Sequence, residues 1–531
     1  MKRFIFPTVA VICIATGFFI GNVTSSSAKT QSWHWSRDNK KSDNKVEQLL
    51  NYIESQYVEQ LNVDSITDEA LTVLVNQLDP HSSYISKQDI DIVNSELGAS
   101  FSGIGVQFSI QNDTVSIISV ISGGPSEGVG VLAGDKIVEV DDSAFVGKKI
   151  NNEKVMHALR GEKGTNVKIG VVRSGVKEIL HYNITRGEIP VHSVDAAFNI
   201  APQIGYVKVN KFSETTYEEF LSALAKLKAS GAKSYIIDLR ENSGGYMDKA
   251  IKMSNEFLEA GDMIVYSEGR AYSRFTAQAF GNGRFKDVPL VVLIDEFSAS
   301  ASEIFAGAMQ DNDRATIIGR RSFGKGLVQQ QYPFTDGSAL RLTVARYYTP
   351  SGRCIQKPYK LGDSSDYQKD LLDRFENGEF FTADSIHQDT VKYYTKKGRV
   401  VHGGGGIMPD IFVGKDTTLN TPYYNNIVNH AYTYQFAYQY TDKNRKVLSS
   451  YKDWQSLEKY LKQHDWMPEL VSFCKAKGIE PNPKQLKKSE PLLRRLVNAY
   501  IIRNILGDEG FYPLYERDDE VVKKAIEVLE K

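Results

Sequence analysis

The apolar positions of the chain repeat with two different periods, which predict helices in some stretches and strands in others. Apolar residues three or four positions apart predict helices within 44–97, over 216–228 and within 416–531. Uninterrupted apolar runs predict strands at 235–240 and 290–294, and the second run has the β-branched content of a strand buried on both faces. Helices and strands alternate in the middle of the chain, which predicts an α/β core.

The strand predicted at 290–294 leads into a serine-rich stretch, SASASE at 298–303, and then into apolar residues at helical spacing. A strand, a turn of small residues and a helix would hold a serine hydroxyl at a helix N-terminus, where backbone N–H groups stabilise an oxyanion. Serine is also a preferred N-cap residue. Taken alone, the stretch predicts a nucleophile or a plain helix cap with equal weight.

A lysine between two glycines, Lys325 in SFGKGLVQ at 322–329, provides the second chemical feature. Glycines on both sides indicate a close approach of the backbone rather than a solvated surface charge. A lysine becomes a general base when burial lowers its pKa from about 10.4. Gln329 lies four residues further on, on the same face, where it would orient the amine. The alternatives are an anion contact for Lys325 and a plain strand position for Gln329.

Four motifs together resemble those of the carboxy-terminal processing (tail-specific) serine proteases: DLRENSGG at 238–245, SASASEI at 298–304, FGKGLVQ at 323–329 and YYTPSGR at 347–353. The resemblance covers residues 45–415, with the motifs in family order. It implies that Ser300 is the nucleophile, that Lys325, 25 residues further on, is its base, and that Gln329 is the orienting third member.

The same resemblance implies an oxyanion hole and a fold. The backbone N–H of Ala301 would form the hole together with that of Gly244 or Gly245, two glycines that would also serve as a helix-start turn. The implied core is the crotonase-like (ClpP-like) fold. Two positions depart from the family pattern: Ser243 replaces the usual proline, and Phe297 replaces a small residue near Ser300.

Residues 98–187 resemble a PDZ domain inserted before the core, on the motifs FSGIGV at 101–106 and GDKIV at 134–138. The glycines leave consecutive backbone N–H groups free for a carboxylate, and the strand that follows can pair with an added peptide strand. The predicted peptide-binding residues are Gly103, Ile104, Gly105 and Val106, with Val155 and Leu159 on a helix at 152–159. An ordinary β-bulge at the glycines is the alternative. Ser126 departs from the usual alanine.

The patterns divide the chain into several regions. They are a signal peptide or membrane anchor (1–28), a linker (29–43), a helical N-terminal segment (44–97), the PDZ domain (98–187), a Ser–Lys protease core (188–415) with an inserted loop bearing short helices (356–400), and a helical C-terminal extension (416–531). The function of the extension is not readable from its sequence.

The N-terminus indicates export. Lys2 and Arg3 precede a mostly apolar run at 4–20, the layout of a secretory signal, and small residues follow at 25–28. The run has about the minimum length that spans a bilayer, so an uncleaved membrane anchor is an alternative interpretation. We therefore expect a periplasmic or otherwise extracytoplasmic protein, secreted across or anchored to the inner membrane.

The composition of the chain mainly excludes other classes of function. Hydrophobic residues make up 41% and charged residues 24% of the 531 residues, as in soluble globular proteins. A net charge of −1 gives no reason to expect nucleic acid. No zinc-type spacing, Walker loop or calcium loop occurs, so neither a metal nor a cofactor is expected. Three cysteines are too few to indicate a compartment.

Three rival interpretations remain. A Ser–His–Asp hydrolase would use His81 or His402, although His81 lies in a turn with Asp79 and Ser82 as local partners. A carboxylate-pair hydrolase would use acidic residues such as Asp238, Asp295 or Glu303, which more often cap strands and helices or bind arginines. The third is a non-catalytic periplasmic PDZ scaffold on a protease fold.

The sequence as a whole predicts a serine endopeptidase that cleaves proteins near their C-terminus after the PDZ domain captures the free terminal carboxylate. Expected partners are proteins or peptides with free C-termini. The resemblance also implies a homodimer through the helical N-terminal segment, and it leaves room for an adaptor protein.

Overall fold

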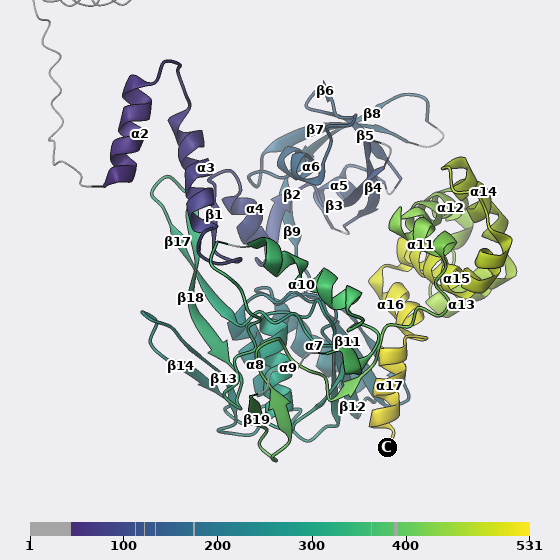
Figure 1. Cartoon of the computed structure of the whole chain (residues 1–531). Coiled ribbons are helices and arrows are strands. Elements are labelled where there is room, and N and C mark those ends of the chain that lie inside the picture. The colour runs from purple at the N-terminus through teal and green to yellow at the C-terminus, as the bar shows by residue number, and fades with distance from the viewer. Residues whose placement is uncertain are drawn as a thin grey trace, which may run out of the picture. The chain divides into compact units, whose positions relative to one another are not determined.

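A computed structural model describes residues 44–111, 113–121, 123–132, 134–173, 176–362, 364–386 and 391–531 (Figure 1). The predicted signal peptide or anchor (1–28) and the linker (29–43) lie outside the described residues. The described residues form two compact units, which are divided between Glu69 and Ala70. No helix in the described part of the chain is both long enough and apolar enough to span a bilayer.

The helices predicted within 44–97 are confirmed as α2 (Lys45–Gln56), α3 (Val63–Val75) and α4 (Ile90–Ser95). Asn44 caps α2 by accepting the N–H of Val46 at 3.0 Å. The region is not entirely helical, because β1 (Ser83–Ile85) pairs with a strand of the protease core. This strand could not be predicted locally, since its pairing partner lies about 255 residues further along the chain.

The PDZ region is a strand-rich domain with its own hydrophobic core. Its sheet has the order β3-β4-β5-β7-β8, and β6 pairs with β5. The predicted helix over 152–159 is confirmed as α6, and the strand after the glycines as β3. The elements are β2 (Ser100–Gly103), β3 (Val106–Gln111), β4 (Thr114–Val120), α5 (Pro125–Gly128), β5 (Lys136–Val140), β6 (Ser143–Ala144), α6 (Asn152–Leu159), β7 (Asn166–Val172), β8 (Leu180–Thr185) and β9 (Gly187–Pro190).

The protease core is built on a six-stranded sheet in which β10 runs antiparallel to β11 and the other neighbours are parallel. Its order is β10 (Val194–Ala201), β11 (Ile204–Val209), β12 (Ser234–Asp238), β15 (Leu290–Ile294), β16 (Thr316–Gly319) and β21 (Ile411–Phe412). Three helices pack on one face: α7 (Thr216–Ala229), α8 (Met247–Asn255) and α9 (Ala301–Asp311).

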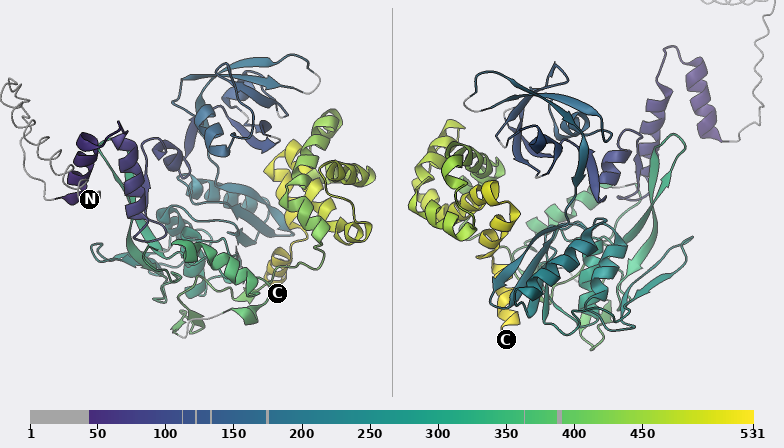
Figure 2. Two further views of the ribbon diagram at one scale, coloured as in Figure 1. Left: turned by 45° about the horizontal axis from the view of Figure 1, so that its top comes forward. Right: turned by 180° about the vertical axis from the view of Figure 1, so that it is seen from behind.

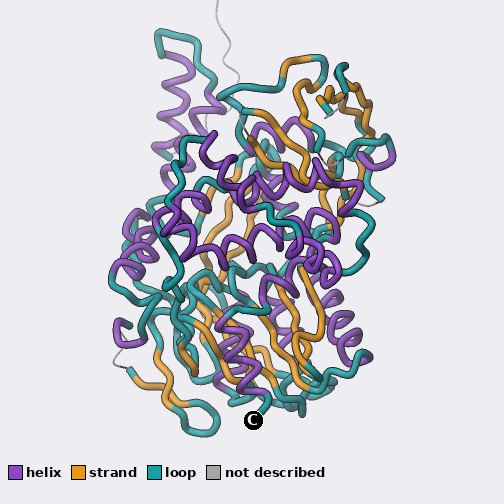
Figure 3. The backbone as a smooth tube through the Cα atoms, turned by 90° about the vertical axis from the view of Figure 1, so that its right-hand side faces the viewer, coloured by secondary structure: helices purple, strands orange, loops and turns teal. Residues whose placement is uncertain are grey.

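The other face of this sheet is covered by the last helix of the chain, α17 (Glu520–Leu529). Val292 and Ile294 of β15 join the cluster beneath α7 to α9, whereas Val291 and Leu293 pack in a cluster with Val522 of α17. The prediction that β15 is buried on both faces is therefore confirmed. Figure 3 shows the strands in orange between helices in purple. The C-terminal region is thus a structural layer of the core as well as an extension.

A second, five-stranded sheet carries the loop around the candidate base. It has the order β1-β18-β13-β14, with β17 paired to β18. Its remaining strands are β13 (Met263–Glu268), β14 (Phe275–Gln278), β17 (Leu327–Pro333) and β18 (Ala339–Tyr348). The inserted loop is more ordered than predicted, because it contains the 13-residue helix α10 (Ser364–Glu376), the short η1 (Ala383–Ser385), and the strands β19 (Lys392–Tyr394) and β20 (Val400–His402).

The helical character predicted for 416–531 is confirmed. These helices form a bundle, light green to yellow in Figure 2, around a core that contains the fully buried Trp466. They are α11 (Pro422–Asn429), α12 (Tyr432–Leu448), α13 (Trp454–Gln463), α14 (Met467–Ala476), α15 (Pro483–Leu506) and α16 (Asp508–Glu516), followed by α17.

Candidate active site

The turn between β15 and α9 separates the roles of its three serines. The hydroxyl of Ser298 donates to the carbonyl oxygen of Leu239 at 2.8 Å, and that of Ser302 donates to the carbonyl oxygen of Asn242 at 2.9 Å. Both side chains are fully buried. Ser300 is partly exposed and lines a cleft of about 1080 Å³. Two of the serines therefore fasten the turn, and the middle one faces the cleft.

Ser300 is held in a backbone conformation that L-residues rarely adopt, with φ 55° and ψ −114°. Such a conformation costs on the order of 1–3 kcal/mol and is found where a surrounding structure imposes it, often at functional sites. Ser300 is also the N-cap of α9, and its N–H donates to Glu303 Oε2 at 2.8 Å. Ser300 therefore occupies the N-cap position of α9 while its side chain stays partly exposed.

The candidate base lies in the loop between β16 and β17 and lines the same cleft. Burial is the largest cause that lowers the pKa of Lys325, and the charge of Arg341 acts in the same direction. Lys325 Nζ donates to Gln329 Oε1 at 3.3 Å, and Gln329 Nε2 donates to the carbonyl oxygen of His81 at 2.6 Å. The lysine amine therefore has a side-chain partner that is itself anchored.

Two residues whose position between the serine and lysine segments could not be predicted from the sequence join these segments. One is Glu303, whose buried carboxylate accepts the N–H groups of Ser300 and Lys325, each at 2.8 Å. The other is Tyr347, whose hydroxyl lies 3.0 Å from the carbonyl oxygen of Ser300 and 2.5 Å from that of Lys325. Both residues lie inside the quoted motifs, but only their contacts across the chain reveal these positions.

The predicted oxyanion-hole residues meet at the turn before α8. A Cβ atom on Gly244 would lie 2.7 Å from Ser300 Cβ and 2.9 Å from Ala301 N. The N–H of Gly244 donates to Asn242 Oδ1 at 2.8 Å. The N–H of Gly245 makes no hydrogen bond among the described residues. This favours Gly245 as the second donor; the assignment stays a prediction.

The two histidines of the rival mechanism occupy different places. His81 lines the cleft, and burial, together with the charge of Lys325, lowers its pKa to about 4. Its Nε2 lies 2.9 Å from the hydroxyl of Tyr367 on α10, and its predicted turn contact with Asp79 is present at 2.9 Å. His402 is not among the residues that line the cleft. His81 therefore contacts Gln329 through its backbone and the helix α10 through its ring.

The carboxylates of the carboxylate-pair interpretation are committed to structural contacts. Burial opposes ionisation of Asp238, but Arg240 and Lys208 hold its pKa below the usual range. Burial raises the pKa of Asp295, and its Oδ1 accepts the N–H groups of Glu241 and other residues of the turn. These contacts match the expectation that such residues cap strands or bind arginines.

The predicted carboxylate loop of the PDZ domain has two unused donors. The N–H groups of Ile104 and Gly105 make no hydrogen bond among the described residues. The hydroxyl of Ser126 donates to the carbonyl oxygen of Ile104 at 2.6 Å, so this departure from the family pattern fastens the loop. Gly103 and Ile104 are buried, whereas Val106 begins β3 and is partly exposed.

The two groove-helix residues are less accessible than a peptide contact requires. Val155 is fully buried and Leu159 is 4% exposed, and both belong to the hydrophobic core of the PDZ domain. A helix residue that packs inward cannot at the same time present its side chain to a groove. Their part in peptide binding stays a prediction that this structure does not support.

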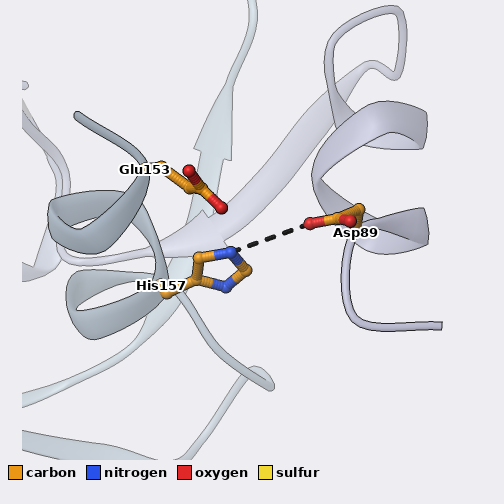
Figure 4. A group of neighbouring side chains, drawn as sticks. All are labelled: Asp89, Glu153 and His157. Carbon is orange, nitrogen blue, oxygen red and sulfur yellow. Dashed lines mark ion pairs between the residues drawn. The ribbon is translucent and has the colours of Figure 1, made fainter. Parts of the chain in front are cut away.

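One group of described residues is arranged so that it could hold a metal ion: Asp89, Glu153 and His157 (Figure 4). His157 Nε2 lies 3.8 Å from Asp89 Oδ1, and Glu153 and His157 are exposed on α6. None of the three lines the cleft that contains Ser300 and Lys325. The group is therefore separate from the candidate catalytic residues.

Comparison with known proteins identifies the family of the chain. Peptidase family S41 matches residues 203–365, a PDZ domain matches residues 102–184, and a family of unknown function matches residues 423–507. The chain is 37% identical over 316 residues to the carboxy-terminal-processing protease of Bartonella bacilliformis, covering 58% of this chain and 71% of that one.

A second relative extends further along the chain. The carboxy-terminal processing protease CtpA of Bacillus subtilis is 33% identical over 407 residues, which cover 74% of this chain and 85% of that one. Among solved structures, a photosystem II D1 C-terminal processing protease is 23% identical, covers 70% of this chain and 87% of its own, and has a TM-score of 0.37. The sequence relatives carry the assignment, since that TM-score is too low to add to it. The chain belongs to the carboxy-terminal-processing protease family and is a serine peptidase with a PDZ domain, a hydrolase of peptide bonds.

Proposed function

We propose that the protein is an endopeptidase that uses a Ser300–Lys325 dyad with Gln329 as the orienting residue. The observation that carries this proposal is the largely buried amine of Lys325, with a lowered pKa and a hydrogen bond to Gln329, in the cleft that Ser300 faces. A neutral amine is a competent general base, and burial favours the neutral form. His81 is an unsuitable substitute, because its Nε2 is engaged with the hydroxyl of Tyr367.

The proposed reaction is acyl transfer. Lys325 Nζ takes the proton from Ser300 Oγ as that oxygen attacks the scissile carbonyl carbon, and the N–H groups of Ala301 and Gly245 bind the resulting oxyanion. Collapse of the tetrahedral intermediate breaks the C–N bond, and the lysine ammonium returns the proton to the leaving amine. Water then hydrolyses the acyl-enzyme by the same route, with Lys325 again acting as the base.

The proposed substrates are polypeptides with free C-termini, captured by the PDZ domain. The adjacent amides of Ile104 and Gly105, which have no hydrogen-bond partner among the described residues, would bind the terminal carboxylate, because consecutive N–H groups of this kind form anion-binding concavities. The partly exposed Val106 at the start of β3 would begin the strand pairing with the bound peptide. Capture of the end of the chain would account for cleavage near that end.

The proposed location is extracytoplasmic, with the N-terminal segment acting as an export signal or an inner-membrane anchor. The charged-then-apolar layout of residues 2–20 supports this proposal. We also propose self-association through the N-terminal helices. The exposed apolar side chains of α2, Val46, Leu49 and Tyr52, support it, because such residues mark protein contacts when they gather on one helix. Binding of an adaptor protein stays a prediction, and no feature of the described residues is offered in its support.

The function is tested with a peptide that has an apolar free C-terminus and with the same peptide amidated, each incubated with the wild type, Ser300→Ala and Lys325→Ala. Cleavage that requires both side chains and weakens on amidation is the expected result. Cleavage that survives Lys325→Ala would overturn the dyad and support a histidine base. Equal cleavage of the amidated peptide would overturn C-terminal capture. No cleavage by the wild type would favour the scaffold interpretation.

A further inference from the structure

A second cavity, of about 750 Å³, lies between the protease core and the C-terminal helices. Arg240, Phe297 and Arg320 are among the residues that line it from the core. From the helical side it is lined by α15 and α16, including Arg495 and Tyr515. Its volume falls within the range of about 300–1,000 Å³ that is typical of ligand sites. No function has been assigned to this cavity by the motifs of the catalytic core.

The walls of the second cavity are fixed to each other by charged contacts. Arg240 donates to Glu516 Oε2 at 2.6 Å and to Asp519 Oδ1 at 2.9 Å. The hydroxyl of Tyr512 donates to Asp195 at 2.7 Å, and α17 packs directly on the protease sheet. Largely buried, hydrogen-bonded ion pairs hold a defined geometry. The C-terminal helices therefore form a wall of the second cavity that is held in a fixed position relative to the core.

The second cavity adjoins the catalytic cleft. Glu241 and Phe297 line both of them. Glu241 lies three residues before Gly244, and Phe297 lies three residues before Ser300, so the shared boundary flanks the catalytic turn on both strands. Phe297 is 47% exposed, which is high for a phenylalanine beside a buried turn. These two side chains therefore mark the boundary that a chain bound at Ser300 would cross to reach the second cavity.

The lining of the second cavity suits a polypeptide segment. Tyr515 and Phe511 stack with ring centroids 4.9 Å apart, and Phe511 stacks on Tyr500 at 5.9 Å. The guanidinium of Arg495 lies 5.9 Å from the Tyr515 ring, and Arg495 forms no ion pair with any described carboxylate. Aromatic rings and arginines are the side chains most enriched at protein-binding surfaces. The many charged groups in the wall argue against an apolar small molecule.

The direction of the bound chain is inferred from the part of the catalytic cleft that lies next to a contact with the PDZ domain. This part is lined by Asn94 and Leu97, next to Ser95, whose hydroxyl accepts a hydrogen bond from Arg160 of the PDZ domain at 2.7 Å. A substrate whose C-terminus is held by the PDZ domain would enter the cleft from this side. We propose that the second cavity binds the substrate segment N-terminal to the scissile bond, against Arg495 and Tyr515. This inference rests on the proposed C-terminal capture.

The test compares a short cleavable peptide with two longer versions. One carries about eight added residues, roughly 27 Å of extended chain, before the scissile bond, and the other carries the same residues after it. The added residues include acidic and aromatic side chains, which complement Arg495 and the stacked rings. Each peptide is cleaved by the wild type, Arg495→Ala, Tyr515→Ala and Lys488→Ala. Lys488 is the matched control, because it is exposed on α15 and does not line the cavity.

We expect the N-terminal extension to raise wild-type kcat/KM at least about fivefold, the effect of one significant interface residue. Arg495→Ala and Tyr515→Ala should each reduce this gain while leaving cleavage of the short peptide unchanged. Lys488→Ala should retain the full gain, and the C-terminal extension should respond to none of the three variants. A gain that is absent in the wild type, or that survives both cavity variants, would overturn the inference.

A binding measurement separates this inference from the proposed function. Fluorescent versions of the three peptides are titrated into Ser300→Ala, alone and combined with Arg495→Ala or Tyr515→Ala, and anisotropy reports affinity without turnover. Tighter binding of the N-terminally extended peptide that is lost with either cavity variant supports the site even if the dyad assignment fails. Equal binding of the short and extended peptides would reject the site whatever the catalytic base proves to be.

Discussion

The backbone N–H of Lys325 donates to Glu303 Oε2 at 2.8 Å, so the loop that carries the candidate base is bonded to the helix that follows the candidate nucleophile, Ser300. The same oxygen accepts the N–H of Ser300 at 2.8 Å. The other oxygen, Oε1, accepts the hydroxyl of Ser322 at 2.5 Å and the N–H of Gly324 at 2.8 Å. Burial raises the pKa of Glu303, although these four donors oppose the rise. One carboxylate thereby sets the spacing of the two segments.

The variant Glu303→Gln tests whether Glu303 positions the segments that carry Ser300 and Lys325. The glutamine amide keeps one acceptor oxygen, but its NH2 group replaces the second oxygen and faces the N–H and O–H donors that this oxygen had accepted. Each buried donor that loses its acceptor in this way costs about 1–3 kcal/mol of folding stability. We expect kcat to fall on the order of tenfold to a hundredfold with a smaller change in KM, together with a lower midpoint of urea unfolding. Glu376→Gln on the exposed face of α10 is the control. Wild-type kcat in Glu303→Gln would contradict this role.

Gly244→Ala should damage the site directly. Gly244 has φ +99°, and an added Cβ would approach Ser300 Cβ and Ala301 N to within 3 Å. The methyl group would displace the nucleophile or the oxyanion donor, so we expect kcat to fall by about 10²–10³, as for loss of one oxyanion donor. Gly128→Ala in the PDZ domain is the control, because its added Cβ meets no atom within 4 Å. Unchanged kcat in Gly244→Ala would place the reaction elsewhere.

The activity should rise with pH, because the neutral amine of Lys325 is the active form. Burial and the charge of Arg341 lower the pKa of this amine below 10.5, so kcat/KM should climb with pH and level off above the lowered value. Arg341→Gln removes a like charge, which should raise the pKa and move the rise to higher pH. Arg346→Gln, exposed on the same strand, is the control. An unmoved profile in Arg341→Gln would show that another group titrates.

His81 should make the fold less stable in acid. Its pKa is lowered from 6.5 to about 4, chiefly by burial, so the unfolded chain binds more protons between these values. The contribution of His81 to the free energy of unfolding is therefore fully retained above pH 6.5. It falls by roughly 3 kcal/mol as the pH drops from 6.5 toward 4. His81→Gln should flatten the loss of the urea midpoint over this range, whereas the exposed His464→Gln should not. Equal slopes in all three proteins would rule out this contribution.

The elements around the site could be predicted to within a few residues. The strand and helix on either side of Ser300 are present as β15 and α9, and the helix at 152–159 matches α6. These predictions succeeded because helical and strand periodicity is a property of neighbouring residues. The strand β1 and the length of α10 were missed. A three-residue strand is stabilised by its partner in the sheet, and a helix in a charged insertion by the surface on which it packs.

By itself, the sequence determined the family, the α/β core and which serine, lysine and glutamine were worth testing, because these depend on residue types at short spacing. Only the tertiary structure decided that Ser298 and Ser302 are tied to Leu239 and Asn242 while Ser300 faces the cleft. It also decided that α17 covers the protease sheet and that a second cavity adjoins the catalytic cleft. Each of these features joins residues 50 or more positions apart, and no local pattern encodes such contacts.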